Sequence, residues 1–552
     1  MGLEAVRKHP GVSTPGYFRI VPFGTAGRVQ VMAVCKDRRP KIMGCGAPQP
    51  YRETSLGSQK LLDPVRKWGY KKIRWQTLNQ AVMKIHIKKL FIALVLLSIL
   101  DIPFSNAHAQ GALTPPGAPA PTMKSLDQIE PRTIVNAVNT PGDASDMFII
   151  SQPGSYYLTT NITASTAING ITIKTNNVTL DLSGFAVQGS GPASSGTAYG
   201  IYIPNAQTNL TVRNGSVSGW KGNGGGGGIG VYAISPVSAN LLFEHLNISA
   251  NGDGIYLYGP GVIRDCMVAH NTGLGIVCSD TSSSASSVTG CTVNDNGSAG
   301  IVIGAGNVST CAANRNGDDG IDSYYGSVSD CTVNDNNGDG IYAQQVTVSG
   351  CTASDNGSDG IYDSSGTVSG CTTFLNGAEG IDMAGGTVSG CTTFGNGESG
   401  IYGAQTTVVG CTANQNNNNG IELDAQSGST IIGKVSGCVV QLNDQNGIFI
   451  NGTGGLITDN SCTSNNVSNI TGCAGITIYY SSGNRIENNH VEGTTYAGII
   501  VNGSNNLIIK NSVTGTSISA NNYMIASGQV IGPIITGTGT ITSTSPWVNF
   551  SF

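Results

Sequence analysis

Two consecutive stretches of the chain carry the pattern that decides the fold. Residues 331–350 read CTVNDNNGDGIYAQQVTVSG, and residues 351–370 read CTASDNGSDGIYDSSGTVSG. The same twenty-residue frame runs without insertion over residues 288–422. Its cysteine column is Cys291, Cys311, Cys331, Cys351, Cys371, Cys391 and Cys411. Seven identical columns at one spacing indicate that each twenty-residue unit is one structural repeat.

A period of twenty residues fits few architectures. Leucine-rich repeats need several leucines per unit, whereas residues 291–420 contain one, Leu375. Short segments with alternating apolar and polar residues, separated by Gly and Asn, indicate strands with one buried face. In each unit the first strand begins at Gly-Ile, the second centres on Val and the third follows Cys. The sequence therefore predicts an all-β chain, a single parallel β-helix of roughly 16–18 coils with three short strands per coil and capped ends.

The ends of the chain differ from this repeat. Residues 1–82 hold 15 Lys and Arg against 4 Asp and Glu, and we interpret them as non-native upstream translation or as a disordered basic leader. Residues 83–109 combine a basic start, an apolar run from Leu90 to Leu100 and an Ala-His-Ala site, which is the pattern of a signal peptide. That run is too short to span a membrane.

The rest of the chain divides into three predicted parts. Residues 110–147 contain four closely spaced prolines and are expected to form a linker and the start of an N-terminal cap. The β-helix is expected over residues 148–525, and a C-terminal cap over residues 526–552. After cleavage the chain would hold 10 Lys and Arg against 28 Asp and Glu. Such an excess of negative charge disfavours nucleic acid, acidic lipid and an unaided polyanion as partners.

The motifs G-I-x-x and V-S-G-C-T-x-x-x-N-G resemble those of right-handed parallel β-helix repeat proteins of the pectin-lyase-like superfamily. Residues 154–158, 178–185 and 213–215 are similar to exported bacterial members of that group with no assigned role. The resemblance covers most of residues 148–525 and implies a right-handed coil. Because this fold carries lyases, hydrolases, epimerases, tailspikes and pure binders, the resemblance leaves the activity open.

The repeated columns have predictable structural roles. Ile, Val and Cys are expected to point inward and to stack at the spacing of neighbouring strands. The Asn column is expected to tolerate left-handed backbone and to form hydrogen bonds along the stack, and Gly to supply turn conformations. We expect the cysteines to be buried free thiols, since in-register stacking holds their Cβ atoms wider apart than a disulfide requires. A local disulfide between Cys462 and Cys473 stays open, and the absence of a CxxC pair argues against a metal ladder.

Two polar columns beside the first strand form the candidate binding surface, and both are expected to face outward. Before Gly-Ile stand the candidate metal ligands Asp319, Asp339, Asp359 and Glu379. Like charges at coil spacing repel by roughly 1 kcal/mol in water, which Ca²⁺ would relieve. On or after the strand stand the candidate glycan-binding residues Asp322, Tyr342, Tyr362, Asp363, Asp382 and Tyr402. The alternative is a solvated face that keeps the rod soluble.

Catalysis is a further hypothesis for the same surface. Asp318 and Asp319 resemble the paired aspartates of polygalacturonase-type hydrolases, although the Gly-His-Gly and Arg-Ile-Lys partners of that family are missing. We take Asp318, Asp319 and Asp339 as candidate acids or bases. Arg315 lies near Asp318 by coil spacing and is the candidate base for lyase chemistry, with a surface ion pair as its alternative role.

Together these patterns predict an exported β-helix that contacts extracellular or periplasmic polysaccharide. Whether it also acts as a polysaccharide lyase or glycoside hydrolase stays open at this stage. The strict repeat has no insertions, and loops are where catalytic sites are usually built, so a pocket would lie near residues 188–235 or 424–434. The rival hypothesis is a structural or adhesive surface rod without catalysis.

Overall fold

The computed structural model describes residues 131–192, 198–221, 228–279, 286–425, 433–537, 539–540 and 542–552. They belong to one compact unit, residues 116–552. The predicted leader, the signal peptide and most of the linker lie outside the described residues. Among the residues described, no helix is long and apolar enough to cross a membrane.

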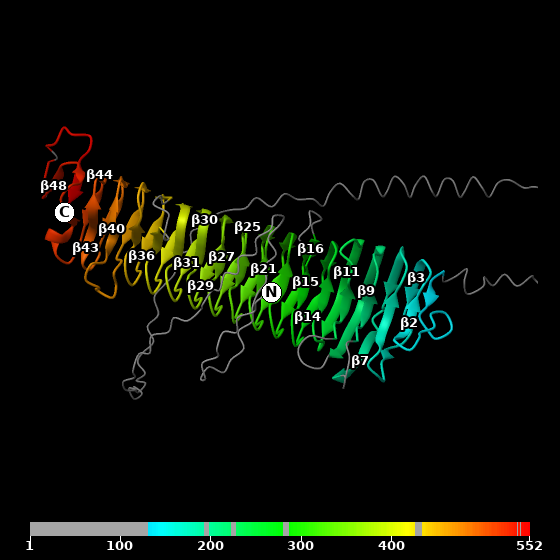
Figure 1. Ribbon diagram of the computed structural model, residues 1–552. Helices are drawn as coiled ribbons and strands as arrows, with labels where there is room; N and C mark the ends of the chain where they lie inside the picture. The colour runs from blue at the N-terminus through cyan, green and yellow to red at the C-terminus, as the bar shows by residue number, and fades with distance from the viewer. Residues whose placement is uncertain are drawn as a thin grey trace, which may run out of the picture. The chain divides into compact units, whose positions relative to one another are not determined.

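The described chain winds into a parallel β-solenoid of about 17 turns, which confirms the predicted fold class. Strands of successive coils lie side by side along one axis (Figure 1). Each strand pairs in parallel with the equivalent strand of the next coil, as Ile321 with Ile341 and Asp322 with Tyr342. A single antiparallel bridge, Pro141 to Phe148, lies outside the named strands of the described chain.

Three sheets run along the solenoid. The first sheet contains β2 (Asp146–Ile150), β5 (Asn169–Ile173), β8 (Ile201–Ile203), β10 (Val231–Ala233), β12 (Ile255–Leu257), β15 (Ile276–Cys278), β18 (Ile301–Ile303), β21 (Ile321–Ser323), β24 (Ile341–Ala343), β27 (Ile361–Asp363), β30 (Ile381–Ser389), β32 (Ile401–Val409), β34 (Ile421–Asp424), β37 (Ile448–Asn451), β40 (Ala474–Ser482), β43 (Ala497–Ser504) and β46 (Tyr523–Ile525). Strands β30 and β32 continue from the first sheet into the second.

The second sheet follows the Val column of the repeat. Its strands are β1 (Thr133–Ile134), β3 (Gly154–Tyr157), β6 (Val178–Asp181), β9 (Thr208–Lys221), β11 (Ala239–Ser249), β13 (Gly261–Arg264), β16 (Ser286–Thr289), β19 (Gly306–Ser309), β22 (Gly326–Ser329), β25 (Val346–Ser349), β28 (Gly366–Ser369), β35 (Lys434–Ser436), β38 (Leu456–Thr458), β41 (Arg485–Glu487), β44 (Leu507–Ile509) and β47 (Val530–Ile531). Strands β9 and β11 continue into the third sheet.

The third sheet follows the Cys column. Its strands are β4 (Ile162–Thr163), β7 (Ala186–Pro192), β14 (Met267–Ala269), β17 (Thr292–Asn294), β20 (Ala312–Asn314), β23 (Thr332–Asn334), β26 (Thr352–Ser354), β29 (Thr372–Phe374), β31 (Thr392–Phe394), β33 (Thr412–Asn414), β36 (Val439–Gln441), β39 (Ser461–Thr463), β42 (His490–Glu492), β45 (Ser512–Thr514), β48 (Ile534–Thr536) and β49 (Asn549–Ser551). One 3₁₀ helix, η1 (Ser519–Asn521), lies near the C-terminal end.

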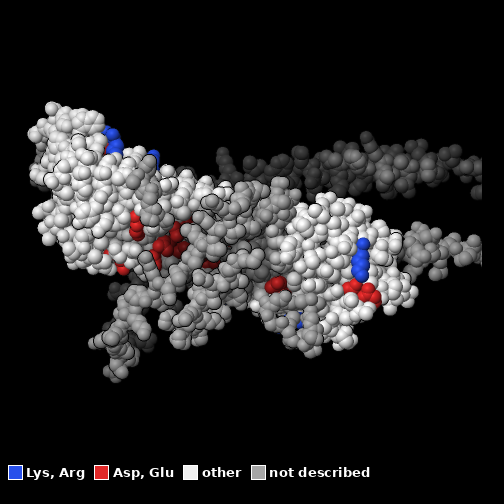
Figure 2. Space-filling model, in the orientation of Figure 1, with Lys and Arg blue, Asp and Glu red and all other residues white. Residues whose placement is uncertain are grey.

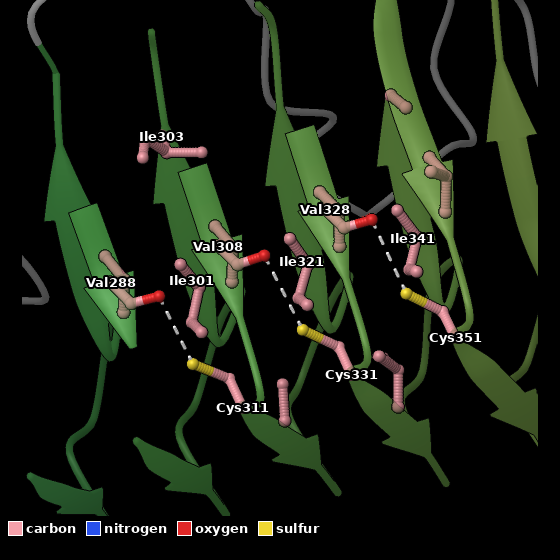
Figure 3. Close-up of a cluster of buried hydrophobic side chains, with 14 of the residues drawn as sticks. Val288, Ile301, Ile303, Val308, Cys311, Ile321, Val328, Cys331, Ile341 and Cys351 are labelled. Atoms are coloured by element: carbon pink, nitrogen blue, oxygen red, sulfur yellow. Dashed lines mark hydrogen bonds between the residues drawn. The ribbon is translucent and has the colours of Figure 1, made fainter. Parts of the chain in front are cut away.

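The core is a set of stacked apolar columns. Ile321, Val328 and Cys331 all lie inside the coil, with at most 1% of their surface exposed. The thiols of Cys311, Cys331 and Cys351 point the same way in successive coils (Figure 3). Each donates to a Val carbonyl of the preceding coil, as Cys311 Sγ to Val288 O at 3.6 Å. All described cysteines are free, Cys462 and Cys473 included. The predicted ladder of buried thiols is therefore confirmed.

The Asn column forms a continuous amide ladder from coil to coil, as predicted. Asn336 Nδ2 donates to Asn356 Oδ1 at 3.0 Å, and the backbone N–H of Asn336 donates to the same oxygen at 3.1 Å. The equivalent side-chain bonds connect Asn251, Asn271, Asn296, Asn316, Asn336, Asn356, Asn376, Asn396, Asn416, Asn443 and Asn465. Buried amides are thus satisfied by identical neighbours one coil away.

The backbone role predicted for the Asn column was wrong. The left-handed residue is the one before it, for example Asp335 with φ of 57°. The Gly before Ile is also needed for a different reason from the one expected. At Gly340 a Cβ atom would lie 2.5 Å from the carbonyl oxygen of Gly360, so close approach of the coils excludes a side chain.

Candidate functional site

The outer face of the first sheet presents one registered column of side chains. We call this the first-sheet face, and its column consists of Tyr202, Tyr232, Tyr256, Val277, Val302, Asp322, Tyr342, Tyr362, Asp382, Tyr402, Glu422 and Phe449. Strand alternation produces it, because the residue after each inward Ile or Val points outward. Six of the twelve side chains are tyrosines, so the face offers aromatic surface along much of its length.

A second column, just before each Gly-Ile step, binds the backbone. Asp319 Oδ1 accepts a hydrogen bond from the N–H of Asp339 at 2.8 Å, and Asp339 Oδ1 accepts one from Asp359 at 3.0 Å. Asp359 Oδ1 accepts from the N–H of Glu379 at 3.1 Å. Two coils after Glu379, the amide oxygen of Asn419 accepts a hydrogen bond from the N–H of Asn446 in the next coil. These side chains therefore hold successive coils together.

The expected solvent exposure of this column was wrong. Asp319, Asp339 and Asp359 are 8%, 7% and 9% exposed. Hydrogen bonding to the next coil draws each carboxyl in against the backbone, where neighbouring coils cover it. The Coulomb argument from exposed charges in water consequently does not apply to them.

Burial changes the protonation of the acidic groups. It raises the pKa of Asp319 to about 7, with the nearby Asp339 carboxylate adding to the effect. Burial, followed by the charges of Asp359 and Asp339, also raises the pKa of Asp382 to about 7. The pKa of Glu379 rises to about 10 through burial and its contact with Asp359. Part of this acidic cluster is therefore protonated near neutral pH.

Two predicted binding residues are not available to a ligand. Asp363 follows Ile361 and Tyr362 in β27, so alternation turns its side chain inward, and it has no exposed surface. Assigning Asp363 to a binding surface was wrong for that reason. Asp322 lies between Val302 and Tyr342 in the outward column and also has no exposed surface.

Two of the three predicted tyrosines, Tyr342 and Tyr362, lie together. The rings of Tyr342 and Tyr362 stack with centroids 5.1 Å apart and planes 9° from parallel. Gln344 Nε2 donates to the Tyr342 hydroxyl at 2.7 Å. Tyr402 follows Asp382 in the same column and precedes Glu422, whose carboxylate accepts from Ser399 at 2.8 Å.

The candidate lyase base is placed in an ion pair. Arg315 donates twice to Asp295, at 2.9 and 2.8 Å, and this pairing lowers the pKa of the Asp295 carboxyl. The guanidinium is thus engaged on the coil before Asp318 and Asp319. Asp318 is exposed at the turn, next to the buried Asp319. The structure does not bring Arg315 and Asp319 into one hydrogen-bonded group.

The residues proposed for calcium do not form a metal site. Within the described ranges, no group of three or more His, Cys, Asp or Glu side chains is placed to hold a metal ion. Asp319, Asp339 and Asp359 each give one oxygen to a backbone N–H. The donor set therefore does not fit the expected calcium site.

Sequence reasoning missed a tyrosine cluster in the N-terminal coils. It contains Tyr199, Tyr202, Tyr232, Tyr256 and Tyr258, with neighbouring ring centroids 4.7–6.3 Å apart. A signal was present: Ile201-Tyr202, Val231-Tyr232 and Ile255-Tyr256 repeat the dipeptide seen at Ile341-Tyr342. The irregular spacing of these coils hid it.

The charge distribution complements this picture. Figure 2 shows acidic atoms on the middle of the visible face and a further acidic group at the right, beside basic atoms. The described residues 286–425 contain a single Lys or Arg, the paired Arg315. These coils therefore offer little electrostatic attraction to a polyanion.

These features define a parallel β-solenoid stabilised by internal ladders, with an aromatic and acidic outer face. The family model described as right-handed β-helix region matches residues 160–327, 238–367, 306–405 and 401–545. The chain therefore belongs to the right-handed β-helix family. No curated protein matches it in sequence.

Solved structures with a similar fold include enzymes and phage proteins. The mannuronan C-5 epimerase AlgE4 A-module of Azotobacter vinelandii is 13% identical, with a TM-score of 0.30, covering 69% of this chain and 91% of its own. The Dettilon tailspike protein is 16% identical, with a TM-score of 0.27 and coverages of 63% and 62%. The periplasmic alginate epimerase AlgG is 11% identical, with a TM-score of 0.23 and coverages of 72% and 84%.

Proposed function

We propose that this protein is an exported β-helix that contacts a polysaccharide along its first-sheet face. The observation that carries the proposal is the registered outward column, in which Tyr202, Tyr232, Tyr256, Tyr342, Tyr362 and Tyr402 recur. Tyrosine combines an apolar ring with a polar hydroxyl, which suits sugars with apolar C–H faces and polar rims. A repeating face along the axis suits a repeating polymer. Export rests on the signal-peptide pattern of residues 83–109.

The acidic cluster supports contact with an uncharged polymer. Burial raises the pKa of Asp382, which lies in the outward column, to about 7, so this carboxyl is partly neutral at physiological pH. The remaining carboxylates would repel a polyuronate, since the described residues 286–425 carry one basic side chain. Cleavage is not part of the proposal, because Arg315 is paired with Asp295 and the acidic column is bound to backbone N–H groups.

The test is binding of the full chain to a panel of polysaccharides. Affinity electrophoresis through gels containing a neutral glucan, a neutral mannan, chitosan or polygalacturonate measures retardation. Retardation by a neutral polymer supports the proposal, and retardation by none of the four refutes it. Release of reducing ends or of unsaturated uronate would reveal cleavage and add an enzymatic role.

A structural rod is the second candidate, and the amide ladder favours it. The ladder runs without a break from Asn251 to Asn465, which makes the described solenoid a long self-supporting element. A rod needs no ligand along its face. The same panel separates the two functions, because a rod is retarded by none of the polymers.

A further inference from the structure

The tyrosine cluster of the N-terminal coils has a geometry that differs from the rest of the face. Tyr199 contacts Tyr202 and Tyr232 with centroid distances of 4.7 Å and ring planes tilted by 34° and 44°. Tyr232 meets Tyr256 edge-on at 88°, and Tyr256 meets Tyr258 at 35°. Five rings from three coils thus converge at different angles. We call this group the tyrosine shelf.

The tilts matter because a sugar stacks on the flat face of a ring. In the pair Tyr342 and Tyr362 the planes are 9° from parallel, so each ring covers a face of the other. Around Tyr232, the Tyr202 ring is stacked with its plane 13° from parallel, whereas the other neighbouring rings are tilted or edge-on at 44°, 59° and 88°. Tyr258 is 38% exposed at the rim of the shelf. The shelf therefore presents one exposed ring beside four half-buried rings.

Polar groups border the shelf at its N-terminal side. Buried Asp146 accepts hydrogen bonds from Thr172 at 2.6 Å, from Asn169 at 2.8 Å and from Lys174 at 3.0 Å. Thr172 lies in the coil before Tyr202 and pairs with it in register, so it extends the outward column by one position. The Lys174 ammonium also lies 3.8 Å from Asp143 and is partly exposed. This cation is already neutralised by two carboxylates but retains N–H donor capacity.

The hydroxyls of the shelf are also available. Among the described residues, Tyr199, Tyr202 and Tyr232 make ring contacts, and no hydrogen bond of their hydroxyl groups is formed. Each such hydroxyl can both donate and accept. The shelf therefore combines partly exposed aromatic rings with polar groups at their edges, which is the composition of a small-molecule site.

We propose that the tyrosine shelf is a binding site for neutral hexopyranose units of a polysaccharide. The apolar faces of the sugar rings stack on Tyr232 and its neighbours, and sugar hydroxyls bond to the tyrosine hydroxyls and Lys174. A uronate would find Lys174 occupied by Asp143 and Asp146, so the site selects against carboxylated sugars. This inference rests on the proposed function and deepens it by naming the site and the sugar class.

The experiment compares variants of the full chain on gels containing hydroxyethylcellulose or polygalacturonate. Tyr232→Leu removes the central ring and keeps apolar bulk, and we expect about tenfold weaker binding to hydroxyethylcellulose. Tyr232→Phe keeps the ring, and we expect a loss of about threefold or less. The matched control is Tyr325→Leu, the same change at a tyrosine that is 47% exposed and lies outside the outward column, with binding within about twofold of wild type.

A second variant keeps the test decisive if Tyr232→Leu fails to fold, as judged by circular dichroism. Tyr258→Ala changes an exposed rim ring and should weaken binding by about threefold to tenfold. Unchanged binding by both Tyr232→Leu and Tyr258→Ala overturns the shelf while the proposed function stands. Stronger retardation by polygalacturonate overturns the sugar class. A wild-type chain that neither polymer retards refutes the shelf, and the proposed function falls as well if the wider panel also fails.

Discussion

Replacing Asn336 by alanine tests the amide ladder at its centre. The Asn336 side-chain oxygen accepts from the backbone N–H of Asn316 at 2.9 Å and from its amide at 3.0 Å. Its own amide donates to the carbonyl of Ala313 and to the side chain of Asn356, both at 3.0 Å. Only 2% of the residue is exposed. We predict that Asn336→Ala lowers the free energy of unfolding by about 2–4 kcal/mol.

The magnitude follows from which groups keep a partner. The amide of Asn316 still donates to Val293 O, and Asn356 Oδ1 still accepts the backbone N–H of residue 336. The backbone N–H of Asn316 is left buried without its acceptor, which costs about 1–3 kcal/mol. The lost bonds of the Asn336 amide add about 1 kcal/mol. Because each coil is stabilised by its neighbours, the loss extends to the adjacent interfaces.

Urea denaturation of the full chain, followed by circular dichroism, measures this effect. The matched control is Asn337→Ala, a change of the next residue, whose exposed side chain forms no hydrogen bond within the described residues. We expect that control to stay within about 0.5 kcal/mol of wild type. If Asn336→Ala is no more destabilising than Asn337→Ala, the ladder does not hold the coils together and the reasoning fails.

Three further predictions concern the coil interior and the acidic cluster. Gly340→Ala places a Cβ 2.5 Å from a carbonyl oxygen of the next coil, whereas a Cβ at Gly385 meets nothing within 4 Å. The melting temperature of Gly340→Ala should therefore fall further than that of Gly385→Ala, and equal shifts would contradict this. Thr373→Val removes a buried hydroxyl with no partner among the described residues. The free energy of unfolding in urea should therefore rise by about 1 kcal/mol, unlike that of the outward Thr372→Val. A lower free energy of unfolding for Thr373→Val would contradict this. Burial raises the folded pKa of Asp382 to about 7, so its contribution to stability is complete below the unfolded pKa of about 4 and is lost as pH rises toward 7. Asp382→Asn should therefore gain stability over wild type at pH 8 relative to pH 4 in urea titrations, and an equal difference at both pH values would contradict the assignment.

The interior of the coil was predictable residue by residue. A strict period places Cys331 over Cys351 and Asn336 over Asn356, because each coil has the same length and the strands pair in register. The free thiols followed from the same stacking, since parallel side chains hold sulfur atoms apart. The inward position of Asp363 was also readable from the alternation in β27, and assigning it to the surface overlooked that rule.

The candidate site was predictable only in part. The outward tyrosines Tyr342, Tyr362 and Tyr402 followed from their place after Ile. The burial of Asp319 did not, because it depends on the backbone N–H of the next coil reaching its carboxylate. The tilted rings around Tyr232 were also beyond the pattern, since the coils there vary in length and no single period applies.

The amino-acid sequence by itself determined the solenoid, its repeat length and the identity of each stacked column, because a periodic chain that pairs in register must place like residues over like. Only the tertiary structure decided which carboxyls are buried, which aromatic rings cluster and which cation is already paired. Those properties depend on distances between atoms of neighbouring coils, and spacing along the chain does not specify them.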